Sequence, residues 1–237
     1  RLLMRFQTPL IPARLLRRYK RFLADVVLAD GQEVTAHCPN PGSMMGLCDP
    51  GTRVFVEPNT DPRKKLKYAW RLVDHENGHM TGIDTGAANK IVKEALEGRK
   101  IPLLDRYDTL RSEVKYGTQS RVDFLLREQG QKDIYLEVKS VTLMREKGLA
   151  EFPDSVTERG LKHLQELARV VEEGHRGVLL FLIQRSDCQL CDIARDIDPA
   201  YARGLEEALA RGIEILCMSC HLSEDIIAVD KPIPFGL

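Results

Sequence analysis

The chain has 237 residues, and its 35 lysine and arginine residues are balanced by 35 aspartate and glutamate residues. Its 43% hydrophobic content suits one large or two small folded domains. No apolar run approaches the roughly 20 residues that a membrane-spanning helix needs, which excludes that class. The opening residues also lack a continuous apolar stretch before Pro9 and Pro12. We therefore expect a soluble, cytoplasmic protein without a secretory signal peptide or a membrane partner.

The first part of the chain alternates between short segments of strand composition and clusters of turn-forming residues. Asp30-Gly31, Pro50-Gly51 and Asn77-Gly78 are typical of turns. Five strands separated in this way predict a small β-barrel. The expected strands cover residues 21–28, 33–38, 53–57, 67–73 and 79–83.

Charge is unevenly divided along the chain. Residues 1–82 hold 13 Lys and Arg against 8 Asp and Glu, a net charge of +5, whereas residues 83–237 hold 22 against 27, a net charge of −5. Basic residues beside aromatic ones suit phosphate neutralisation combined with base stacking. Alternatively, the basic residues belong to solvated loops and Trp70 is a core residue. On the first interpretation the nucleic-acid contacts include Arg17, Arg18, Lys64, Lys65, Lys67, Tyr68 and Trp70.

A helix is expected directly after the barrel segments. Thr85 is the predicted N-cap of a helix through residues 87–96 that stops at Gly98. We therefore place a boundary near residue 83, which gives domains of residues 1–82 and 83–237. After this helix we expect three strands, a helix at 159–173, an apolar strand at 178–183, a helix at about 199–211 and a strand at 213–218. This order predicts an α/β core with a mixed sheet, in a chain that is α+β overall.

Two of these strands carry charged residues. Asp123 lies in one apolar segment, Glu137 and Lys139 lie in the next, and the polar stretch between them predicts a hairpin turn. Residues two apart in a strand leave the same face, so Glu137 and Lys139 point together. Carboxylates suit Mg²⁺ or Mn²⁺, which polarise a phosphoryl oxygen, and a lysine can orient the attacking water. The set predicts a magnesium-dependent nuclease site with Asp123 and Glu137 as metal ligands.

The same residues are also compatible with a cross-strand ion pair on a solvated sheet face. Their apolar neighbours weigh against that alternative. A Glu and a Lys buried without a partner or a task would cost several kcal/mol, and ionisable groups in such places often mark functional sites.

Two further segments carry candidate contacts. In the helix at 159–173 the apolar residues recur at helical spacing and leave Arg159, Lys162 and His163 on the opposite, polar face. These three residues are candidates to support the site, although a surface helix also carries such residues for solubility. The loop at 37–44 has two prolines and a glycine, which predicts a rigid turn that exposes the Asn40 side chain and the Ser43 hydroxyl.

Cysteines raise a rival hypothesis. Two CxxC pairs near the ends of the last two predicted strands suggest a structural Zn²⁺ site. Against it, positions i and i+3 of a strand face opposite ways, and reduced thiols are the alternative in a cytosolic protein. The four cysteines are Cys188, Cys191, Cys217 and Cys220.

The motifs together resemble the sugar fermentation stimulation protein A family of bacteria and archaea. The resemblance is carried by residues 37–44, 121–124, 136–142 and 152–171, and extends along nearly the whole chain. It implies an N-terminal OB-type barrel and a C-terminal domain similar to the PD-(D/E)xK restriction endonucleases. In that superfamily Asp123 and Glu137 match the metal-binding acids and Lys139 the catalytic lysine, with Glu113 a candidate for an extra acid. Val122 stands where the motif has proline.

The resemblance also implies non-specific DNA binding and a link to the regulation of sugar (maltose) metabolism. We adopt binding of single- or double-stranded DNA as the expected function, with a nuclease-like metal site as a further hypothesis. The alternatives are an active magnesium-dependent DNA or RNA nuclease and a zinc-containing module that binds protein or RNA. A monomer and a homodimer are both left open.

Overall fold

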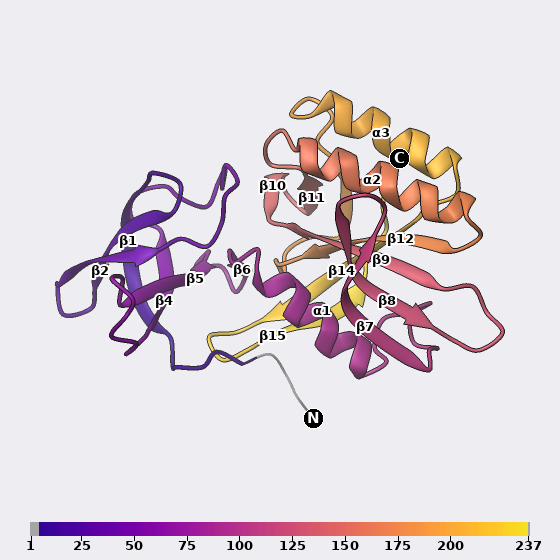
Figure 1. The fold of residues 1–237 in the computed structure, drawn as a ribbon. Coiled ribbons are helices and arrows are strands. Elements are labelled where there is room, and N and C mark those ends of the chain that lie inside the picture. Colours follow the sequence, from indigo (N-terminus) through magenta and orange to yellow (C-terminus); the bar gives the residue numbers. More distant parts are fainter. Residues whose placement is uncertain (1–4, 237) are drawn as a thin grey trace.

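The computed structural model describes residues 5–236 as two lobes that lie side by side (Figure 1). The N-terminal lobe is a closed barrel in the order β3-β2-β1-β4-β5, in which β3 also pairs with β5. A short sixth strand extends the edge of β5. The strands are β1 (Ile11–Tyr19), β2 (Leu23–Leu28), β3 (Glu33–His37), β4 (Arg53–Pro58), β5 (Tyr68–Asp74) and β6 (Met80–Gly82).

The barrel has five strands as predicted, but they are not the same five segments of the chain. Strand β1 was not expected, because its exposed arginines hide the alternation that buries Ala13 and Leu15. The predicted strand at 21–28 begins at Leu23, since Lys20 and Arg21 have left-handed φ angles of 48° and 67° and form the turn before it. The fifth predicted strand is β6, which lies outside the closed barrel.

The C-terminal lobe is built on a mixed six-stranded sheet in the order β15-β14-β12-β9-β8-β7. Its central strands β9, β12 and β14 are parallel, and the others are antiparallel. Strand β12 is buried almost throughout, as an apolar strand covered on both faces must be. The strands are β7 (Thr109–Tyr116), β8 (Ser120–Arg127), β9 (Ile134–Val141), β12 (Arg176–Ile183), β14 (Glu214–Leu222) and β15 (Ile227–Pro232).

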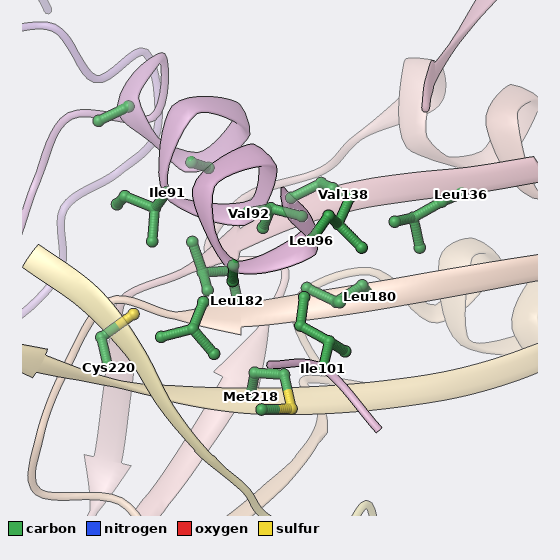
Figure 2. Packing of buried hydrophobic residues seen from close by; sticks show 14 of the residues in the cluster. Ile91, Val92, Leu96, Ile101, Leu136, Val138, Leu180, Leu182, Met218 and Cys220 are labelled. Carbon is green, nitrogen blue, oxygen red and sulfur yellow. The ribbon is translucent and has the colours of Figure 1, made fainter. Parts of the chain in front are cut away.

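Helix α1 (Ala87–Glu97) covers one face of this sheet. Its residues Ile91, Val92 and Leu96 point at β9 and β12, where they meet Val138 and Leu182 (Figure 2). The helix ends at Gly98 as predicted, but its N-cap is Gly86. The predicted cap, Thr85, instead donates its hydroxyl to the Pro39 carbonyl.

Helices α2 (Glu158–Glu172) and α3 (Pro199–Ala210) cover the other face. The Thr157 hydroxyl caps α2 by accepting from Gly160 N, and Asp198 caps α3 by accepting from Tyr201 N. The second carboxylate oxygen of Asp198 accepts from Thr157 N, so the two helix starts are fixed together. Both helices lie within two residues of the ranges predicted from their spacing.

Four strands of the C-terminal lobe were not predicted from the sequence. Strands β10 (Leu143–Glu146), β11 (Leu149–Phe152) and β13 (Leu190–Ile193) form a separate three-stranded sheet, and β15 borders the main one. The strands of the small sheet have only four residues each, too few to show a period. Strands β10 and β11 carry the chain from β9 to the start of α2.

The two lobes contact each other through an apolar cluster that both share and through hydrogen bonds. Gly82 N donates to the Gln184 carbonyl, and Thr81 bridges Arg185 at the end of β12. The loop after β3 reaches across to Asp154, whose carboxylate accepts from Met44 N at 3.3 Å. Within residues 5–236, no helix is both long and apolar enough to cross a membrane.

Candidate functional site

The predicted carboxylates meet where the pairing of β8 with β9 ends. The pairing stops at Phe124 with Leu136, and the next residues along the two strands are Asp123 and Glu137. Asp123 Oδ2 accepts from Val138 N at 2.7 Å, so a side chain takes over from the backbone ladder. Asp123 Oδ1 accepts from Asn89 Nδ2 of α1 at 2.8 Å. The end of the pairing therefore opens the sheet at the site and fixes the Asp123 carboxylate.

Glu137 is the centre of a tight polar cluster. Its Oε1 lies 3.4 Å from Lys139 Nζ and 2.8 Å from His163 Nδ1, and these two nitrogens are 3.0 Å apart. As strand alternation predicts, Glu137 and Lys139 share a face while Val138 packs in the core under α1. Only 4% of the Glu137 side chain and 15% of the Lys139 side chain are exposed. His163 is also buried, although its place on the polar face of α2 had suggested exposure.

The cluster holds more negative charge than its partners balance. Glu137 Oε2 is buried without a hydrogen-bond partner among the described residues. Burial, together with the charge of Glu137, raises the pKa of Asp123 from 3.8 to about 6. Burial, and after it the charge of Glu137, also raises the pKa values of the buried tyrosines Tyr116 and Tyr201. Such an excess is typical of a site that receives a cation.

A cleft of about 1280 Å³ lies over this cluster. Both lobes line it: Asn40 to Gly42 come from the barrel loop, and Asp123, Glu137, Lys139 and His163 form part of the C-terminal side. Four exposed cations also line it, and none of them forms an ion pair within residues 5–236. These unpaired cations are Arg21, Arg121, Arg159 and Lys162.

Among the supporting candidates, Arg159 and Lys162 lie near the start of α2 and line the cleft. Glu113 also lines it, with a left-handed φ of 55° between the pairs Ser112–Phe124 and Val114–Val122. For a non-glycine residue this conformation is strained, and strained residues concentrate at functional sites.

Several predicted nucleic-acid contacts have structural roles instead. Trp70 is fully buried in the barrel core, and its ring nitrogen donates to the Leu72 carbonyl, so the prediction of a stacking platform at Trp70 is wrong. The prediction that Asn40 is exposed is also wrong: its side chain is buried and joins the Ile83 carbonyl to Gly42 N. Ser43 lies outside the cleft lining, and its hydroxyl accepts from Met45 N.

The basic residues of the barrel are largely engaged. Arg17 pairs with Asp25, and the Arg18 guanidinium donates to carbonyls of the 40–43 loop. Lys67 Nζ donates to two carbonyls of its own loop. Lys64 and Lys65 are exposed in that loop, and none of these residues, nor Tyr68, lines the cleft.

The cysteines divide between the two faces of the main sheet. Cys188, Cys191 and Cys217 pack under α2 and α3, whereas Cys220 packs on the α1 side, near Leu182 in Figure 2. Burial, then the nearby Asp187 carboxylate, raises the pKa of Cys188 to about 12, which keeps its thiol protonated. The four sulfur atoms therefore do not face one common point.

The sequence analysis missed Asn89, Arg21 and Arg121 as site residues. Asn89 looks like any polar residue of an amphipathic helix, and only the packing of α1 on β9 brings it to Asp123. Arg121 had an available signal, since residues 121 and 123 of one strand share a face.

Relatives of the chain decide its family. The family model "Sugar fermentation stimulation protein RE domain" matches residues 86–226, and "SfsA N-terminal OB domain" matches residues 16–83. A sugar fermentation stimulation protein homolog of Ruegeria pomeroyi is 64% identical over 220 residues, covering 93% of this chain and 96% of that protein. The chain belongs to the sugar fermentation stimulation protein family. A homolog of Roseobacter denitrificans is 60% identical over 99% of this chain and all of that protein.

A solved structure of a relative has the same fold as this chain. SfsA of Pyrococcus furiosus, described in complex with Ca²⁺, matches with a TM-score of 0.86 and 29% identity over 99% of both chains. The prediction of an OB-like barrel followed by a nuclease-like α/β lobe is thus confirmed.

Proposed function

We propose that this family member binds DNA without sequence specificity in the cleft between its lobes and cleaves phosphodiester bonds with a divalent cation held by Asp123 and Glu137. The observation that carries the proposal is the buried, partnerless Glu137 Oε2 beside Asp123, at the floor of a cleft lined by unpaired cations. A buried, uncompensated carboxylate beside unpaired cations suits a metal ion together with a polyanion.

The two carboxylates fit Mg²⁺ or Mn²⁺. Both are hard oxygen ligands, and Mg²⁺ commonly takes only one or two carboxylates and completes its shell with waters and substrate phosphates. Across residues 5–236 no three His, Cys, Asp or Glu side chains are grouped to hold a metal alone. The Pyrococcus furiosus relative, solved in complex with Ca²⁺, supports a divalent cation in this family.

The side chains around the carboxylates have distinct tasks in this proposal. A bound cation would supply Lewis acidity toward a phosphoryl oxygen. Lys139 presents its ammonium beside Glu137 and neutralises charge that develops on the phosphate. Asn89 and Val138 N hold Asp123 in one orientation, and His163 holds the Glu137 oxygen that faces Lys139. Arg121, Arg159 and Lys162 bind flanking phosphates.

The test is cleavage and retention of labelled single- and double-stranded DNA by the purified protein with Mg²⁺ or Mn²⁺, compared with EDTA and with Lys139→Ala. We expect metal-dependent cleavage that the variant loses while its retention of DNA persists. Retention without cleavage in the parent would leave a DNA-binding protein with a nuclease-like site, and absence of both would overturn the proposal. The link to sugar metabolism and a homodimeric state stay predictions from the family and the sequence.

A further inference from the structure

The turn between β1 and β2 presents an aromatic ring to solvent. Phe22 is 45% exposed and is the one aromatic among the exposed large hydrophobic residues of the described chain. Its ring stacks on the exposed ring of His37, with centroids 6.4 Å apart and planes 23° from parallel. Both residues stay exposed, so part of the aromatic surface of the pair is open to solvent.

The position of this pair is fixed relative to the cleft. Leu23 pairs with His37 at the end of the β2–β3 hairpin, and Cys38 N donates to the Phe22 carbonyl. Arg18 joins the turn to the cleft loop, because its guanidinium donates to the carbonyls of Arg21, Asn40 and Gly42 at 3.0, 2.8 and 2.8 Å. Arg18 is thus a positioning residue.

The residue beside Phe22 faces the cleft itself. Arg21 lines the cleft and is one of the four unpaired cations around it. Both Lys20 and Arg21 adopt left-handed φ angles, a strained arrangement for two consecutive non-glycine residues that directs Arg21 to the cleft just before the next strand begins. An unpaired cation of the cleft lining therefore precedes an exposed aromatic ring in the chain, and single-strand binders combine positive charge with aromatic rings in this way.

We propose that the Phe22–His37 pair is a stacking site for an unpaired base of a DNA strand whose phosphates enter the cleft past Arg21. The proposal rests on the function proposed above and narrows its substrate to DNA with unpaired bases beside the metal site. An internal base of a duplex is covered on both faces, so it cannot stack on the exposed ring, whereas every base of a single strand can. The location agrees with the general use of the β1–β2 loop and the β2–β3 face in OB barrels.

The test is fluorescence anisotropy with one DNA of about 20 nucleotides, presented as a single strand and as a blunt duplex, in Ca²⁺. Phe22→Ala is expected to weaken single-strand binding about tenfold or more and to change duplex binding less than about twofold. Phe22→Trp should restore single-strand binding. Leu103→Ala is the matched control, because Leu103 is 64% exposed and lies outside the cleft lining.

A second readout separates stacking from a structural effect. A single strand that carries 2-aminopurine should lose fluorescence on binding to the parent and to Phe22→Trp, but not on binding to Phe22→Ala. Single-strand binding by Phe22→Ala equal to that of Leu103→Ala, or equal losses for single strand and duplex, would overturn this inference and leave DNA binding intact. If the parent binds neither DNA, the proposed function fails and this inference fails with it.

Discussion

The two sides of the cleft use charge in opposite ways. The barrel carries the basic excess of the chain, yet Arg17, Arg18 and Lys67 are held by a carboxylate or by carbonyls, and Arg21 is the one described barrel cation in the cleft lining. The C-terminal side has a net negative sequence, yet Arg121 and Arg159 stay unpaired there, within the part of the chain that the structure describes, and Glu137 is buried with a partnerless oxygen. Engaged cations hold loops in place, whereas the exposed Arg121 and Arg159 stay free to contact a ligand, and the buried oxygen of Glu137 costs free energy in the protein alone. Net charge along a sequence is therefore a poor guide to where a polyanion binds.

The largest expected effect comes from removing the charge that defines the C-terminal side. Glu137→Ala should lower the rate of metal-dependent DNA cleavage by about a thousandfold or more, because it removes a metal ligand and the partner of Lys139. Single-turnover cleavage with Mn²⁺ measures it. Glu97→Ala is the control, since this exposed carboxylate of α1 lies outside the cleft. Equal rates for Glu137→Ala and the parent would remove the mechanism.

The raised pKa of Asp123 predicts a pH dependence of stability opposite to that of a carboxylate whose pKa is lowered by folding. Unfolded protein releases this proton near pH 3.8 and the fold releases it near pH 6, so the folded state binds more protons between these values. The contribution of Asp123 to the free energy of unfolding should then fall as pH rises from about 4 to about 6, by on the order of 2 kcal/mol.

Urea unfolding in EDTA across this range, for the parent and Asp123→Asn, isolates the contribution of one carboxyl. The asparagine variant should lack this decline, because it has no proton to lose at the site. Parallel pH profiles for the two proteins would contradict the uncompensated charge inferred at Glu137 and Asp123.

A third prediction compares how cations of the two sides contribute to DNA binding. Arg121→Ala with Arg159→Ala should weaken DNA binding about tenfold and reduce the slope of log K against log salt by roughly 1.4 to 1.8, two phosphate contacts. Lys64→Ala with Lys65→Ala should reduce the slope less, because these residues lie outside the cleft lining. Anisotropy titrations between about 50 and about 200 mM salt, which bracket the physiological range, measure both slopes. A larger change in the lysine pair would move the binding surface to the loop at 59–67.

The smallest effect is expected where the sides touch. A Cβ added at Gly42 would meet the carboxylate of Asp154 at less than a van der Waals contact. Gly42→Ala should therefore displace the barrel loop from Asp154, at a cost on the order of 1 kcal/mol in thermal or urea unfolding.

The effect of Gly42→Ala should shrink in an Asp154→Ala background, since the clash is then absent. An unchanged loss of stability from Gly42→Ala in that background would show that the clash with Asp154 is not its cause.

Local signals in the sequence were sufficient for much of the fold. Three features each depend on a few neighbouring residues and can therefore be recognised in the sequence. They are the spacing of apolar residues in α2 and α3, the continuous apolar segment of β12 and the end of α1 at Gly98. The pairing of Asp123 with Glu137 and Lys139 was likewise predictable, because a period of two fixes which side chains share a strand face.

Only the tertiary structure decided which polar groups meet and which are covered. Trp70 is as aromatic as Phe22, and Asn40 is as polar as many surface residues. The fold nevertheless buries Trp70 and Asn40 and leaves Phe22 exposed. Asn89 and His163 reach the carboxylates from helices on opposite faces of the sheet. These two contacts join residues 34 and 26 positions apart in the chain. Burial depends on what packs above a side chain, which no local pattern records.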